Sequence, residues 1–169
     1  MTFADPQLLT GLGSALSIFL ASAGSAIASA EGGIYALRKK GPLAFIPIII
    51  SGVLAIYGII ISILLIGKME DGSDEIMTEA HGYRHLSAGL SVGLACLASG
   101  FGIARFLGHL NKVAIECDNE ADSPESQPLI QRERRAMVQE NFVYLTMTLC
   151  FLEAIGLYGL IVALFLIGK

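Results

Sequence analysis

Four long apolar segments, separated by polar stretches, run through the chain. They cover approximately residues 8–30, 43–66, 86–107 and 142–167. Each supplies the roughly 20 apolar residues that a helix needs to cross a hydrocarbon core about 30 Å thick. A spanning helix satisfies its own backbone polar groups, and the alternation typical of barrel strands is absent. The sequence therefore predicts an all-α membrane protein with four transmembrane helices.

Composition supports this prediction and excludes several functions. Hydrophobic residues make up 54% of the chain and charged residues only 15%, too few to cover the surface of a soluble domain. The sequence lacks a phosphate-binding Gly-x-x-x-x-Gly-Lys-Ser/Thr loop, so any ATP chemistry belongs to a partner. Cys96, Cys117 and Cys150 form no regular pattern, which argues against a disulfide framework or a metal site. We expect no cofactor, no bound metal and no nucleic-acid partner.

Charge is distributed unevenly between the polar stretches. Basic residues follow the first and third apolar segments: Arg38, Lys39, Lys40, Lys112, Arg132, Arg134 and Arg135. Acidic residues follow the second segment: Glu70, Asp71, Asp74, Glu75 and Glu79. Because basic loops remain on the cytoplasmic side of a membrane, loops 1 and 3 are predicted to be cytoplasmic. Both termini and the second loop would then be lumenal.

The chain repeats itself. Residues 56–60 (Ile-Tyr-Gly-Ile-Ile) match residues 157–161 (Leu-Tyr-Gly-Leu-Ile), and the Leu-Ile-Gly-Lys at 65–68 recurs at 166–169 in the same register. Preceding segments also align, with Ser25 matching Ser99. Agreement across both halves indicates two fused helical hairpins with the same orientation in the membrane.

The two hairpins are predicted to occupy residues 1–68 and 86–169. An acidic lumenal loop, 69–85, would join them. The second hairpin contains a polar stretch, 111–141, with two prolines and mixed charge. We interpret this stretch as a long cytoplasmic surface loop with a short helix near 131–139.

The first and third segments are rich in Gly, Ala and Ser, whereas the second and fourth are rich in Ile, Leu and Phe. Small residues allow helix backbones to approach closely. This favours an inner layer made of the first and third helices and an outer, lipid-facing layer made of the other two. Such hairpins placed side by side make a curved wall that can close into a ring. An ordinary compact four-helix bundle remains an alternative.

Glu153 lies about eleven residues into the fourth segment, about 16 Å from its cytoplasmic end and near mid-membrane. Its counterpart in the first hairpin is Gly52. No Lys or Arg occurs in the apolar body of any segment, so desolvation favours the protonated, neutral carboxyl. A group that crosses a lipid zone neutral and ionises where it meets water or a fixed cation has the properties of a proton carrier. The alternative is a carboxyl that only joins helices by a hydrogen bond.

Other polar residues are weaker candidates. Tyr57 and Tyr158, in the matching Tyr-Gly steps, lie about one turn from the Glu153 level and are candidates to donate hydroxyl groups to it, or to fill space. Glu31 is expected at the rim of the first helix, in contact with water. The three histidines, His81, His85 and His109, are expected to be solvated groups in loops or at helix ends.

Residues 151–164 resemble the carrier helix of the duplicated proteolipid subunit c of eukaryotic V-type ATPases. Residues 46–58 look like the second helix of that family, which also lacks a carboxylate, and 89–94 with 98–101 are similar to its third helix. The resemblance implies a rotor ring of such copies and related proteolipids, with one proton carried per subunit on Glu153. It also implies a stationary membrane subunit with an essential arginine, central-stalk subunits, and ATP hydrolysis on a separate soluble sector. The implied location is the vacuole or another acidic endomembrane.

Three departures affect the expected contacts at the membrane surfaces. Residues 31–33 read Glu-Gly-Gly where relatives typically have a basic residue. The third loop is longer than usual in the family and acidic near 116–125, and the second loop is long and acidic. Sodium-pumping relatives have Thr-Gln where this chain has Val53 and Leu54, and two apolar residues there favour a proton. The alternative functions are a structural or channel-forming proteolipid and a small secondary transporter.

Overall fold

The computed structural model describes residues 5–39, 42–70, 79–121 and 128–168. Its elements are α1 (Pro6–Lys39), the short 3-10 helix η1 (Pro42–Phe45), α2 (Ile46–Glu70), α3 (Glu79–Ala121) and α4 (Pro128–Ile167). The described ranges contain no strand. Each of the four long helices contains a stretch long and apolar enough to cross a membrane. The predicted all-α class with four membrane-spanning helices is therefore confirmed.

The helices extend further than the apolar segments. The stretch 111–141, expected to be a loop, is helical to Ala121 and again from Pro128, so the short helix expected near 131–139 is part of α4. Similarly, α3 begins at Glu79, inside the expected acidic loop 69–85; residues 71–78 lie outside the described ranges. The physical reason is that hydropathy marks only where a helix can meet lipid. A helix satisfies its own hydrogen bonds in water as well, and a proline is tolerated in its first turn.

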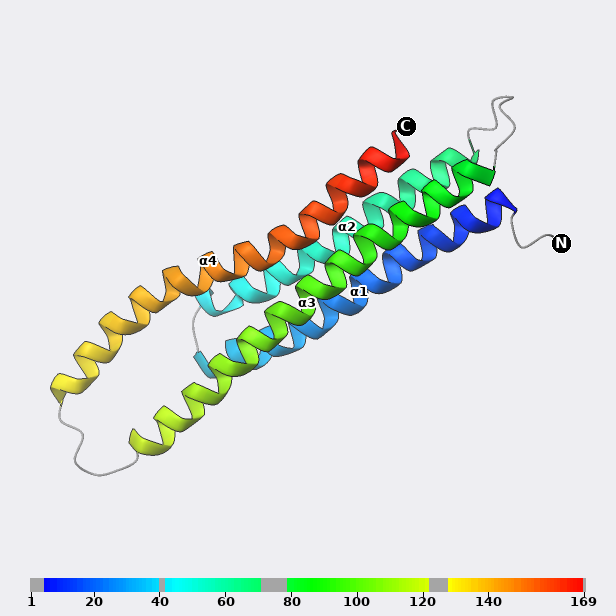
Figure 1. The fold of residues 1–169 in the computed structure, drawn as a ribbon. Coiled ribbons are helices and arrows are strands. Elements are labelled where there is room, and N and C mark those ends of the chain that lie inside the picture. Colours follow the sequence, from blue (N-terminus) through cyan, green and yellow to red (C-terminus); the bar gives the residue numbers. More distant parts are fainter. Residues whose placement is uncertain (1–4, 40–41, 71–78, 122–127, 169) are drawn as a thin grey trace.

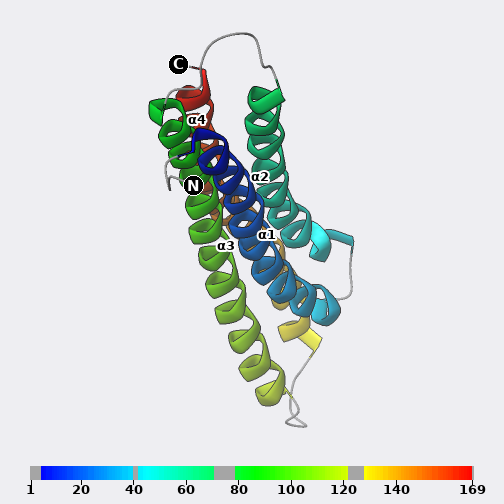
Figure 2. The same ribbon diagram turned by 90° about the vertical axis from the view of Figure 1, so that its right-hand side faces the viewer.

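All four helices lie roughly along one axis, with the start of α1 and the end of α4 at the same end of the bundle (Figure 1). The C-terminal part of α3 and the N-terminal part of α4 project beyond the opposite end (Figure 1). Figures 1 and 2 both show α1 and α3 side by side. Gly13 approaches Leu86 and Gly24 approaches Leu97, so these two helices run parallel.

Glycines set the spacing between helices. A Cβ added to Gly100 would collide with the backbone carbonyl of Gly24, and one added to Gly89 would collide with that of Gly13. On the flanks, a Cβ on Gly58 of α2 would lie 2.6 Å from the Ser17 carbonyl oxygen of α1. Small residues thus allow the close α1–α3 approach expected from the sequence.

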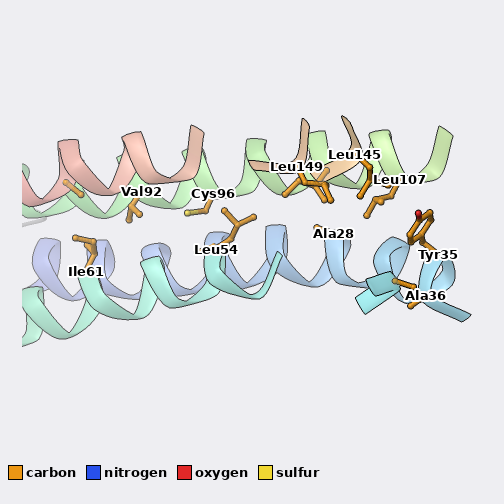
Figure 3. Packing of buried hydrophobic residues seen from close by; sticks show 14 of the residues in the cluster. Ala28, Tyr35, Ala36, Leu54, Ile61, Val92, Cys96, Leu107, Leu145 and Leu149 are labelled. Carbon is orange, nitrogen blue, oxygen red and sulfur yellow. The ribbon is translucent and has the colours of Figure 1, made fainter. Parts of the chain in front are cut away.

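The buried centre is mostly apolar. Leu54 of α2 and Cys96 of α3, both fully buried, face each other across the bundle (Figure 3). Several hydroxyl groups are buried or half-buried beside this core. Ser14 of α1 lies 2.6 Å from Ser62 of α2, Oγ to Oγ, and Ser29 lies 2.8 Å from Ser51. Each hydroxyl therefore has a partner across the α1–α2 contact.

His85 differs from its expected position. Its side chain is only 6% exposed, and its Nδ1 lies 3.0 Å from the Thr10 hydroxyl of α1. His81 and His109 are exposed, in line with the expectation for them. His85 is buried because α1 packs along α3 over the first turns of both helices, which hydropathy alone does not indicate.

Candidate functional site

Glu153 lies within the apolar part of α4, and its side chain is half-buried. The hydroxyl of Tyr57, from α2, donates a hydrogen bond to Glu153 Oε1 at 3.0 Å. Tyr57 precedes Gly58, the residue that brings α2 onto α1. The carboxyl group thus has a polar partner in the second half of the first hairpin, although 96 positions separate the two residues.

Apolar groups close the site on the side of the bundle core. A Cβ on Gly156, one turn beyond Glu153, would lie 2.7 Å from Leu54 Cδ2 and 3.5 Å from Cys96 Sγ. Because Gly156 has no side chain, α4 can approach both α2 and α3 at this level. The apolar side chain of Leu54 therefore lies next to the turn of α4 that bears Glu153.

A second polar contact holds the backbone of α4 near the carboxyl group. The Ser99 hydroxyl, on α3, donates to the Leu152 carbonyl oxygen at 2.6 Å, and Ser99 is fully buried. The sequence aligned Ser99 with Ser25 but showed no sign of this contact. Which face of α3 meets α4 is decided only by packing.

The structure does not bring the other predicted residues together with Glu153 in the same way. Tyr158 is 64% exposed, and no hydrogen bond joins it to Glu153 in the described structure. The two residues are five positions apart, so their side chains point about 140° apart around α4. Gly52 is half-buried, and a Cβ there would meet nothing within 4 Å. The first hairpin therefore has space at this position.

Glu31 is not at the end of its helix, because α1 continues to Lys39. Its half-buried side chain lies near α3, where Asn111 Nδ2 is 3.4 Å from Glu31 Oε2. Arg105, on α3, is exposed. Glu31 thus has an amide partner, which the sequence did not indicate, and its side chain is still partly exposed.

Within the described residues, no group of three or more His, Cys, Asp or Glu side chains is placed to hold a metal ion. Cys96 is a buried free thiol and Cys150 an exposed one. Cys117 lies outside the residues whose side chains the structure describes. Two carboxyl groups in the membrane-capable helices have a side-chain donor: Glu153 has the Tyr57 hydroxyl, and Glu31 has the Asn111 amide.

The fold and the site together define an integral, multi-pass membrane protein with a carboxyl group within an apolar helix and a tyrosine hydroxyl bound to it. The chain belongs to the family of V-type proton ATPase proteolipid subunits. It is 35% identical to V-type proton ATPase subunit c' of Candida glabrata over 165 residues, covering 93% of this chain and 85% of the relative.

Two further relatives support the same family. Subunit c' of Saccharomyces cerevisiae is 35% identical over 162 residues, covering 91% of this chain and 84% of the relative. The 16 kDa proteolipid subunit c of the V-type proton ATPase of Nephrops norvegicus is 32% identical over 164 residues, covering 94% and 89%. No family model matches the chain. The resemblance read from residues 46–58, 89–101 and 151–164 therefore extends over nearly the whole sequence.

Proposed function

We propose that this chain is a proton-translocating rotor subunit of the membrane sector of a V-type ATPase. One proton per subunit travels on Glu153. The observation that carries the proposal is the Tyr57–Glu153 hydrogen bond, which gives a carboxyl group inside an apolar helix one defined polar partner. ATP hydrolysis takes place on other subunits of the complex.

In the resting subunit, the proton resides on the carboxyl group while Oε1 accepts the Tyr57 hydrogen bond. A protonated carboxyl is neutral, so it crosses the lipid-facing arc of the ring at far lower free-energy cost than a carboxylate. A fixed arginine on a stationary membrane subunit favours the ionised form and releases the proton into a half-channel. A second half-channel supplies the next proton.

The choice of proton over sodium follows from the lining of the site. A dehydrated metal cation needs several oxygen ligands. Leu54 is fully buried against Gly156, and the neighbouring residue is Val53. Hydrocarbon at these two positions leaves the carboxyl group and the Tyr57 hydroxyl as the polar groups of the site, which suits a proton.

The assembly proposed is a ring of copies of this chain and related proteolipids, with the stationary subunit at its side and central-stalk subunits on its cytoplasmic face. Loops 1 and 3 face the cytoplasm and both termini face the lumen of a vacuole or another acidic endomembrane compartment. Counting the copies in the purified complex by native mass spectrometry tests the ring. A single copy per complex would contradict the rotary proposal, and retained acidification in a Glu153→Gln complex would contradict the carrier.

Replacing Tyr57 by Phe is expected to slow ATP-driven acidification about 2- to 10-fold. The aromatic ring of residue 57 stays in place, but Glu153 loses a hydrogen bond of ordinary strength. Tyr158→Phe is the matched control, since its hydroxyl is not bonded to Glu153 and its side chain is exposed. Initial rates of vesicle acidification measure both. Equal rates for the two variants would show that the Tyr57 hydroxyl plays no part in the cycle.

A further inference from the structure

The contact between Ser99 and α4 lies next to the residue that bears the carboxyl group. Ser99 is fully buried, and its Oγ donates to the carbonyl oxygen of Leu152, which immediately precedes Glu153. The separation of 2.6 Å is at the short end of the range for hydroxyl donors. The contact thus ties α3 to the α4 backbone at the level of the site.

This is not the usual partner of a serine within a helix. Such a hydroxyl commonly donates to a carbonyl three or four residues earlier in its own helix. Ser51 does so to Ile48 and Ser87 to Arg84. Ser99 instead crosses to a neighbouring helix, to a carbonyl that in a regular helix also accepts the N–H of Gly156.

Glu153 is therefore held from two sides. Tyr57 of α2 binds its side chain, and Ser99 of α3 binds the backbone one residue before it. The distance from the Glu153 Cα to the Tyr57 hydroxyl depends on where the α4 backbone lies. The Ser99 bond to the Leu152 carbonyl therefore bears on whether the carboxyl group lies within reach of the Tyr57 hydroxyl.

The other hairpin lacks this tie at the corresponding position. The duplication aligns Ser99 with Ser25 and Leu152 with Ser51. Ser25 is also buried, at 7% exposure, yet the described structure contains no hydrogen bond from Ser25 to the Ser51 backbone. The Ser51 hydroxyl bonds Ser29 and Ile48 instead. In the first hairpin a serine-to-backbone bond between helices occurs elsewhere, from the Ser17 hydroxyl of α1 to the Gly58 carbonyl oxygen of α2 at 3.2 Å. Among the described residues, a tie next to the aligned pair Glu153 and Gly52 thus occurs in the hairpin that has the carboxyl group and not in the other.

We propose that Ser99 is a positioning residue for the proton carrier: it fixes the α4 backbone so that Glu153 meets the Tyr57 hydroxyl. The proposal rests on the proposed function for its effect on transport, but its geometry is testable without it.

The test compares Ser99→Ala with Ser25→Ala, its counterpart in the other hairpin. Infrared difference spectra of the purified full chain in lipid vesicles report the C=O stretch of the protonated Glu153 carboxyl, assigned by its loss in Glu153→Gln. We expect Ser99→Ala to move this band in the same direction as Tyr57→Phe, because both weaken the hydrogen bond to Oε1. Ser25→Ala and the donor-retaining Ser99→Thr are expected to leave it in place.

In the assembled complex, Ser99→Ala is expected to slow acidification about 2- to 10-fold, the effect of one hydrogen bond. The Ser99→Ala/Tyr57→Phe double variant is expected to be little slower than the slower single variant, because both changes disturb one contact. An unmoved infrared band, or rates that multiply in the double variant, would overturn the proposal. If Ser99→Ala does not assemble, the band in the isolated chain still decides. Retained acidification in Glu153→Gln would instead refute the carrier function and leave the infrared result standing.

Discussion

Replacing Glu153 by Gln is expected to abolish ATP-driven acidification, with a loss of about 100-fold or more, while the assembled complex is retained. Gln has nearly the same shape and still accepts a hydrogen bond from Tyr57, but its amide cannot bind and release a proton in the working pH range. The close approach of Gly156 to Leu54 and Cys96 does not involve the substituted side chain. The measurement is the initial rate of acidification of vesicles that contain a verified amount of complex.

The matched control is Glu31→Gln, which replaces another half-buried carboxyl group on a membrane helix. Glu31 lies beside Asn111, at the α1–α3 contact, and is expected to keep near-normal acidification when replaced. Glu153→Asp, one methylene shorter, is expected to fall between wild type and Glu153→Gln because the carboxyl group no longer reaches Tyr57 at 3.0 Å. Acidification by the Glu153→Gln complex at the wild-type rate would contradict the carrier role.

The second large effect concerns packing. Gly100→Ala is expected to destabilise the protein by about 1–3 kcal/mol, because the new Cβ would collide with the Gly24 carbonyl at one of the two closest approaches of α1 and α3. Backbone cannot rotate away as a side chain can, so the two helices must separate. The thermal midpoint of the purified protein, followed by circular dichroism, should fall by about 2–10 °C.

Gly11→Ala supplies a control of opposite sign. A Cβ at Gly11 meets nothing within 4 Å, and replacing a helical glycine by alanine gains up to about 1 kcal/mol in helix propensity. We expect an unchanged or raised midpoint. If both variants behave alike, the close approach of Gly24 and Gly100 does not contribute to stability.

Local features of the sequence are sufficient to predict the class of fold and the position of Glu153 in its helix. Length and hydropathy determine how many helices can span a membrane. The repeated Tyr-Gly steps set the alignment of the two hairpins, in which Glu153 corresponds to Gly52. These properties depend on neighbouring residues along the chain. For the same reason the prediction that residues 111–141 form a loop was wrong over most of its length, because α3 extends to Ala121 and α4 begins at Pro128. Polarity shows where a helix leaves lipid but not where the helix ends.

Contacts between helices were decided only by the tertiary structure. Two tyrosines stood in matching motifs, yet only Tyr57 is hydrogen-bonded to Glu153, because α2 turns that face toward α4 while Tyr158 lies on the exposed side of α4. His85 is buried, and Ser99 holds the backbone beside the carboxyl group. Periodicity gives the faces of a helix but not which neighbour each face meets. That choice depends on the helix separations and rotations set by residues such as Gly24, Gly100 and Gly156. The sequence by itself thus determined that a carboxyl group lies within an apolar helix, and packing determined what that carboxyl group touches.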